Sequence, residues 1–341
     1  GNHFIISLRG ERAIVKVAVM HNQLTVIDRI DTGAEPIGLV VSEDASKVYV
    51  AVSQSGLVEE RSGDTLELIR SFKIDHEPRW LALHPSGRTL YVATAMGGHL
   101  IVVDLVSGST QDQALPRISV PLVTEDFRLA DRSRRITGDL TVRPDGRQLL
   151  VPVLYIDNIN PIDGEPDEEE PAGDGYGNSS SGKRFIAAVA TIDVNAEGQP
   201  TGRGKVEELE GNMDGQTVRG GYITSLTAHP TRDVAFATME ASDTLIAFTI
   251  APTETQCTYG SAGDGHGLEL GIGGGGVTRM ASPTSIDDFA RQAQQRGFAT
   301  QRGPTGVAFA NDDIIVHSRL ARTAQRVAVD EMSPTRRHSV A

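Results

Sequence analysis

Carboxylates gather in one stretch near the middle of the chain, where they could bind a hard cation. Residues 157–174 contain eight Asp or Glu and no Lys or Arg. Carboxylate oxygens are the ligands that Ca²⁺ prefers, and the candidate ligands are Asp157, Asp163, Glu165 and Asp167. An EF-hand needs Asp or Asn at its first position, five residues before a glycine, but counting back from Gly164 gives Ile159. The favoured prediction is therefore a solvated acidic loop, with a calcium site as the alternative.

A second set of candidates is basic and occupies one position of a repeat. Two residues before the start of a repeat stand His76, Arg135 and Arg302, and Arg79 lies close to this column. Arginine presents a planar fork suited to a carboxylate or phosphate. If these side chains converge, they would bind an acidic partner or an anionic group such as a haem propionate. In the alternative, each arginine pairs with a nearby carboxylate, such as Glu77 or Asp139.

Other signatures of chemistry are incomplete. The glycine-rich residues 258–276 lack the Gly-Lys-Ser/Thr of a phosphate-binding loop, and no GxSxG nucleophile motif occurs. The single Cys257 cannot form an internal disulfide, a zinc cage or a CxxCH haem attachment site. His84 and His229 each precede a proline or polar turn at the same repeat position, which favours a structural role over a catalytic one.

The elements that must position these residues form a repeat of short strands. Residues 78–95, PRWLALHPSGRTLYVATA, contain two apolar runs around a Pro-Ser-Gly turn, and alternation of period two indicates strands. Proline presets φ in the turn and glycine takes a positive φ. Equivalent units start at Pro36, Thr137, Ile223 and Pro304. The alignment places on equivalent innermost strands Leu39, Leu81, Leu140, Leu226 and Val307.

Third and fourth strands follow in several units, so the sequence predicts an all-β fold, a β-propeller of four-stranded antiparallel blades. Six blades are counted, or seven if an insertion conceals a degenerate unit. One propeller domain is expected over residues 1–335, with insertions at 157–183 and 251–303, and residues 336–341 are expected to form a C-terminal tail or the start of a linker. A short helix is predicted from Ser282 in the late insertion. The leading unit lacks a clear first strand, and QLTVIDRIDTG from Gln23 resembles a third strand.

The pattern PxxLAxxPxGRxLYVAT…VxVID, clearest in residues 23–110, resembles the YVTN-type β-propeller repeat. The insertion after VPVLY and the ending SPTRRHSVA are similar to propeller modules associated with di-haem cytochrome c peroxidase or MauG-like domains. The resemblance implies a non-catalytic binding or scaffold module whose protein partner is a c-type cytochrome domain. Haem would then lie on the partner or on a segment outside this sequence, and calcium is the one cofactor considered for this chain itself. Two alternatives stay open, a hydrolase or lactonase-like enzyme with a divalent metal in the channel, and a calcium-assisted adhesin.

The composition of the chain limits the classes of partner and the locations that can be expected for it. The formal net charge of −13 argues against a nucleic-acid surface, which would need a clustered basic face. The apolar runs are of strand length, so no transmembrane segment is predicted. A single cysteine fits the cytoplasm as well as the periplasm, and the resemblance favours a periplasmic, extracellular or cell-surface location.

Overall fold

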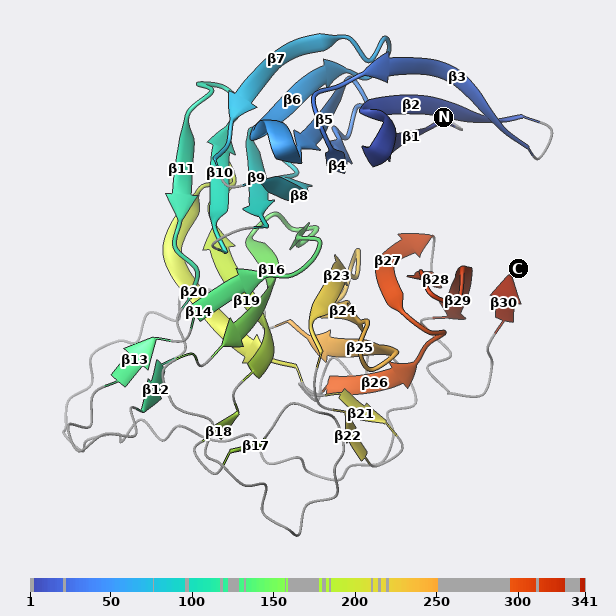
Figure 1. Ribbon diagram of the computed structural model, residues 1–341. Coiled ribbons are helices and arrows are strands. Elements are labelled where there is room, and N and C mark those ends of the chain that lie inside the picture. The colour runs from blue at the N-terminus through green and yellow to red at the C-terminus, as the bar shows by residue number, and fades with distance from the viewer. Residues whose placement is uncertain are drawn as a thin grey trace.

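Six antiparallel sheets follow one another along the chain in the computed structural model, in an arc (Figure 1). The structure describes residues 3–20, 23–75, 77–95, 98–116, 119–121, 129–131, 133–156, 158, 178–179, 182–183, 185–209, 211–213, 216–218, 221–250, 295–310, 313–328 and 338–340. The first sheet has three strands, β1 (His3–Leu8), β2 (Ala13–Met20) and β3 (Gln23–Asp31). The second contains β4 (Pro36–Val41), β5 (Lys47–Val52), β6 (Leu57–Ser62) and β7 (Leu68–Lys73).

The next sheets repeat the four-stranded order. The third contains β8 (Pro78–Leu83), β9 (Thr89–Thr94), β10 (Leu100–Asp104) and β11 (Thr110–Gln113). In the fourth, β14 (Ser133–Ile136) and β15 (Thr141–Val142) both pair with β16 (Gln148–Ile156), and β19 (Phe185–Val194) and β20 (Pro200–Glu208) follow. The fifth contains β23 (Ile223–Ala228), β24 (Val234–Met239), β25 (Thr244–Thr249) and β26 (Gln295–Ala299), and the sixth β27 (Pro304–Ala310), β28 (Asp313–Ser318), β29 (Thr323–Ala328) and β30 (His338–Val340).

Three small hairpins and two 3₁₀ turns complete the described elements. The hairpins are β12 (Ser119–Pro121) with β13 (Leu129–Asp131), β17 (Asn178–Ser179) with β18 (Gly182–Lys183), and β21 (Gly211–Met213) with β22 (Gln216–Val218). The 3₁₀ turns are η1 (Arg9–Glu11) and η2 (Ser53–Ser55). No α-helix occurs in the described part of the chain, and most of the helix predicted from Ser282 lies outside it.

The core lies between neighbouring blades, because alternating residues of each strand face the sheets on either side. Tyr49 and Ala51 of β5 pack with Leu90 and Val92 of β9, while Val48 of the same strand packs toward the first sheet. Four of the five residues predicted to be equivalent lie on first strands, and the fifth, Leu140, directly precedes β15. All of them are buried except Leu39, which is half-buried. These repeated sheets confirm the predicted β-propeller of about six blades.

Hydroxyl groups connect the first strands of successive blades. Thr137 Oγ1 donates to the Ile223 carbonyl at 2.7 Å, and Thr224 Oγ1 donates to the Pro304 carbonyl at 3.0 Å. Backbones approach closely there, because a Cβ on Gly38 would lie 2.1 Å from the Arg79 carbonyl oxygen. Only glycine, which has no Cβ, tolerates another backbone at so short a distance. These contacts fix the angle between neighbouring sheets and hence the geometry of any site between them.

Three sequence predictions about element boundaries were wrong. β3 is the fourth-strand equivalent, since Thr32 N–H donates to the Arg12 carbonyl as Ile74 N–H donates to the Gly56 carbonyl in the next blade. Residues 295–299, assigned to an insertion and in part to the helix, pair with β25 as the fourth strand of the fifth blade. Residues 338–340, assigned to a tail, pair with β29. Fourth strands are polar outer edges, so their hydrophobic pattern is weak.

Candidate functional site

A cavity of about 650 Å³ lies between the third and fourth blades and contains one of the predicted basic residues. Its walls come from the turn before β10, the end of β11, strand β14 and the end of β16. The lining residues are Gly98, His99, Asp112, Gln113, Ala114, Leu115, Ser133, Arg134, Arg135, Ile156 and Asn158. The site therefore forms only when two blades pack side by side.

Strand β14 supplies the basic wall of the cavity. Arg134 Nη1 donates to the Leu115 carbonyl at 2.7 Å, which fixes one guanidinium across the blade boundary. Arg135 pairs with Leu154 of β16 through the backbone, and its side chain is exposed. No hydrogen bond or ion pair joins the Arg135 side chain to another described residue. Its donors are thus available to a ligand that enters the cavity.

The facing wall carries a histidine and a carboxylate. His99 Nδ1 and Asp112 Oδ2 lie 2.7 Å apart, and about a third of the His99 side chain is exposed. Asp112 pairs with Ile101, two residues after His99, so the His99 and Asp112 side chains are diagonal neighbours on one face of the β10–β11 pair. Asn158 Nδ2 donates to Ser133 Oγ at 2.7 Å on the remaining side. The cavity thus contains two arginines and one carboxylate, and that carboxylate already interacts with His99. The cavity would therefore attract an anionic group.

The other members of the basic column lie outside this cavity. Arg79, on β8, has a buried Nε without a hydrogen-bond partner, and its Cζ is 6.0 Å from the Trp80 ring centroid. Arg302 is exposed in the turn before β27, where its carbonyl accepts from the Ala321 N–H. Among the described residues, no ion pair joins these arginines to Glu77 or Asp139. The structure brings no described members of the column into contact, and His76 lies outside the described residues.

The predicted calcium ligands Asp157, Asp163, Glu165 and Asp167 also lie outside the described residues. Within the described ranges, no group of three or more His, Cys, Asp or Glu could hold a metal ion. No helix found there is long and apolar enough to cross a membrane. Sequence reasoning missed His99 and Asp112 because neither belongs to a recurring column. The only signal in the sequence was that His99 and Asp112 lie at the two outer ends of a pair of consecutive strand patterns.

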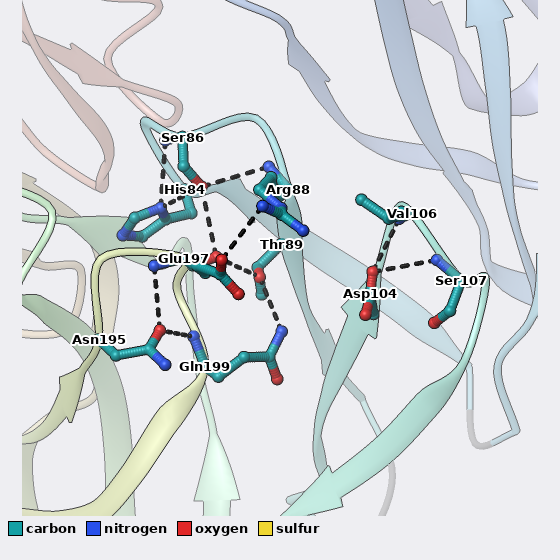
Figure 2. Close-up of polar contacts among 10 residues, drawn as sticks. All are labelled: His84, Ser86, Arg88, Thr89, Asp104, Val106, Ser107, Asn195, Glu197 and Gln199. Carbon is teal, nitrogen blue, oxygen red and sulfur yellow. Dashed lines mark hydrogen bonds and ion pairs between the residues drawn. The ribbon is translucent and has the colours of Figure 1, made fainter.

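His84 forms a structural junction of the kind predicted for it (Figure 2). Its ring is buried, with Nδ1 2.8 Å from Ser86 Oγ and Nε2 2.7 Å from the Gly146 carbonyl of the fourth blade. Figure 2 also shows the Glu197 carbonyl, which accepts from Ser86 Oγ and, at 2.7 Å, from Thr89 Oγ1. Both ring nitrogens of His84 therefore have partners, and the Nε2 contact crosses from the third blade to the fourth.

Asp104, the last residue of β10, stabilises the turn that follows its strand. Its Oδ1 accepts from the Val106 N–H at 2.7 Å and from the Ser107 N–H at 3.2 Å, as Figure 2 shows. These bonds lower the pKa of Asp104, because they stabilise the ionised form. Asp193 differs, since its carboxylate accepts from Gln148 Nε2 at 2.9 Å.

The fold and the cavity between its blades define the class of protein, an all-β propeller with its candidate site at a blade boundary. No known family model matches the sequence, and no curated protein matches it. Solved structures do match. The chain is similar to "Kuenenia stuttgartiensis Hydrazine Synthase" at 15% identity and a TM-score of 0.54, covering 97% of this chain and 94% of that one.

Two further structures are similar. A "functionally unknown protein from Desulfotomaculum acetoxidans DSM 771" has 11% identity and a TM-score of 0.55, with coverage of 100% of this chain and 79% of that one. A chain of the "Nidogen/Laminin Complex" has 10% identity and a TM-score of 0.53, with coverage of 98% and 92%. At such identities the likeness concerns the fold alone.

Proposed function

We propose that this protein is a non-catalytic binding module whose cavity between the third and fourth blades receives an anionic group of a partner protein. The observation that carries the proposal is Arg135, an exposed guanidinium without a partner among the described residues, beside Arg134 in a preformed cavity. A cavity built on strands keeps its donors in place, which reduces the entropy lost on binding.

Charge supports the anionic nature of the ligand. The chain as a whole carries −13, yet this cavity presents two arginines and only one carboxylate, which is paired with His99. A local basic site on an acidic protein attracts an acidic group of the partner. It repels the basic groups of that partner less than a wholly basic surface would. Arginine binds carboxylates through paired hydrogen bonds, so the proposed ligand group is a carboxylate.

The partner class that we propose to test first is a c-type cytochrome domain, because its haem propionates are carboxylates and the repeat resembles propeller modules associated with such domains. A periplasmic or cell-surface location belongs to the same proposal. For the alternative of a metal-dependent hydrolase, the described residues offer no metal-binding cluster in support. The calcium-assisted adhesin rests on residues outside the described part of the chain.

The experiment compares single arginine variants of the intact chain. Fluorescence anisotropy would follow binding of a labelled ten-residue glutamate peptide and of a haem c octapeptide, at about 20 and 200 mM salt. Arg135→Ala should weaken the affinity for at least one of these probes about tenfold at low salt and flatten its salt dependence. Arg147→Ala is the matched control, because Arg147 is an exposed arginine just before β16, at the opposite end of that strand from Ile156. Its affinity should stay within about twofold of the parent.

The double variant Arg135→Ala/Arg302→Ala tests the two arginines of the predicted column together. Equal affinities for the single and double variants would place Arg302 outside the site. If Arg135→Ala binds both probes as well as the parent at low salt, the cavity is not the binding site and the proposal is wrong. Circular dichroism and thermal unfolding of each variant verify that the fold is retained.

A further inference from the structure

Among the described residues, Asp112 is the one carboxylate that lines the cavity between the third and fourth blades. Its Oδ2 lies 2.7 Å from Nδ1 of His99, and 55% of the Asp112 side chain is exposed. A carboxylate only accepts hydrogen bonds, so the proton between the two groups belongs to Nδ1 of His99. The contact with His99 therefore holds this carboxylate at one place in the cavity wall.

The charged side chains of the described lining leave a small positive excess. Arg134 and Arg135 contribute two positive charges, Asp112 contributes one negative charge, and His99 adds none in its neutral form. An excess of one positive charge balances the single charge of a carboxylate. A phosphate monoester carries about −1.5 to −2 at neutral pH, so it would leave negative charge uncompensated beside Asp112.

The neutral polar side chains of the cavity already donate to protein atoms. The Ser133 hydroxyl donates to the Ile156 carbonyl at 3.3 Å, and Asn158 Nδ2 donates to Ser133 Oγ at 2.7 Å. Gln113 Nε2 donates to the Ala114 carbonyl at 2.8 Å. This part of the wall therefore contributes few of the donors that a phosphate group needs for its three acceptor oxygens.

The remaining donors of the cavity belong to the two arginines. Arg134 Nη1 uses one of its protons on the Leu115 carbonyl, at 2.7 Å. The Arg135 side chain has no hydrogen bond or ion pair with another described residue, so its planar fork is available to a ligand. One such fork matches the two oxygens of a single carboxylate.

We propose that Asp112, held in position by His99, is the specificity-determining residue of this cavity, which admits a carboxylate and rejects a phosphate group. This inference rests on the proposed function, because it concerns the ligand of the same cavity. The repulsion between Asp112 and a ligand is proportional to the charge of the ligand, so it acts about twice as strongly on a dianion as on a monoanion. A like charge placed against the wrong ligand is a general means of discrimination.

The probes are two capped tripeptides, with one glutamate or one phosphoserine between glycines. Nuclear magnetic resonance titration of the isotope-labelled chain at neutral pH and about 20 mM salt measures millimolar affinities, and the backbone amide of Arg135 reports on the site. The parent should bind the glutamate tripeptide at least about threefold more tightly than the phosphoserine tripeptide.

The variant Asp112→Asn removes the charge and keeps an oxygen that accepts from Nδ1 of His99. The affinity for the glutamate tripeptide should rise about threefold. The affinity for the phosphoserine tripeptide should rise about tenfold, because doubling the ligand charge squares the factor. The preference for the carboxylate should therefore disappear. Thermal unfolding of the variant verifies that the fold is retained.

The matched control is Glu197→Gln, which removes one negative charge outside the cavity. The Glu197 side chain is 56% exposed and lies 3.1 Å from Arg88, so its exposure and its pairing with a cationic side chain resemble those of Asp112 (Figure 2). This variant should change each affinity less than about 1.5-fold and leave the preference intact.

Two results would overturn the assignment of Asp112 while the cavity remains a binding site, as judged by loss of binding in Arg135→Ala. One is tighter binding of the phosphoserine tripeptide by the parent, and the other is an equal rise in both affinities in Asp112→Asn. If Arg135→Ala binds both tripeptides as well as the parent does, the proposed function fails and this inference fails with it.

Discussion

At the scale of single residues, Asp139 lies just before β15, and although neighbouring strands crowd its carboxylate, the residue retains exposed surface. Desolvation raises its pKa above the ordinary value of 3.8, although a hydrogen bond with Ser225 opposes the shift. A raised pKa in the folded state means that stability is fully present below the unfolded pKa and is lost as pH rises through the folded pKa. Asp139→Asn should therefore be more stable than the parent at pH 7 and lose this gain at pH 3. Urea unfolding at several pH values measures the difference.

Asp44 provides a control in which the pKa shift has the opposite sign to that of Asp139. Hydrogen bonds from Ser42 Oγ and from the Ser46 N–H and Oγ–H lower the pKa of Asp44 to about 2. Its contribution is present above the unfolded pKa of 3.8 and is lost as pH falls toward 2. Asp44→Asn should thus be less stable than the parent at pH 7, and the difference should shrink below about pH 4. If Asp139→Asn changes the free energy of unfolding by the same amount at every pH, the raised pKa of Asp139 is contradicted.

At the scale of elements, β6 carries three consecutive charged residues that are all buried. Arg61 Nη2 lies 2.7 Å from Glu59 Oε2, and the same guanidinium donates to the carbonyls of Leu66 and Asp31. Arg61→Met removes these bonds and leaves the Glu59 carboxylate buried without its cation, so we expect a loss of about 3–5 kcal/mol in the free energy of unfolding. Denaturant unfolding measures this loss, and Glu59→Gln added to Arg61→Met should recover part of it.

The matched control for this prediction is an exposed ion pair between blades. Arg88 Nη1 and Glu197 Oε1 are 3.1 Å apart, with both side chains about half exposed. Arg88→Met should cost no more than about 1 kcal/mol, because water screens the pair. If Arg61→Met and Arg88→Met cost the same, burial does not govern the strength of these pairs in this protein.

At the scale of the whole molecule, the described core residues of the first blade pack against one neighbouring blade, whereas those of the third blade pack against a blade on either side. Local opening is easier where fewer apolar contacts must be broken. Amides of β1 and β2 should exchange hydrogen at least about tenfold faster than those of β9 and β10. Mass spectrometry of peptic fragments measures the ratio. Equal protection of the two blades would contradict this prediction.

The sequence alone was sufficient for the repeated architecture. The equivalence of Leu39, Leu81, Leu140, Leu226 and Val307, the Pro-x-Gly turns, and the structural role of His84 all follow from local patterns. Gly87 and Gly146 do have positive φ values of 69°, as the turns required. Alternation and turn chemistry depend on neighbours in sequence, so they are readable before folding. Outer strands were misassigned at both ends of the chain because polar edges carry little hydrophobic pattern.

Only the tertiary structure decided which side chains meet. His99 and Asp112 face Arg135 across a blade boundary, and no spacing in the sequence indicates that three different strands end around one cavity. Arg135 and Arg302, which share one column of the alignment, are not in contact in the described structure, because equivalent positions on separate blades are related by rotation about the ring.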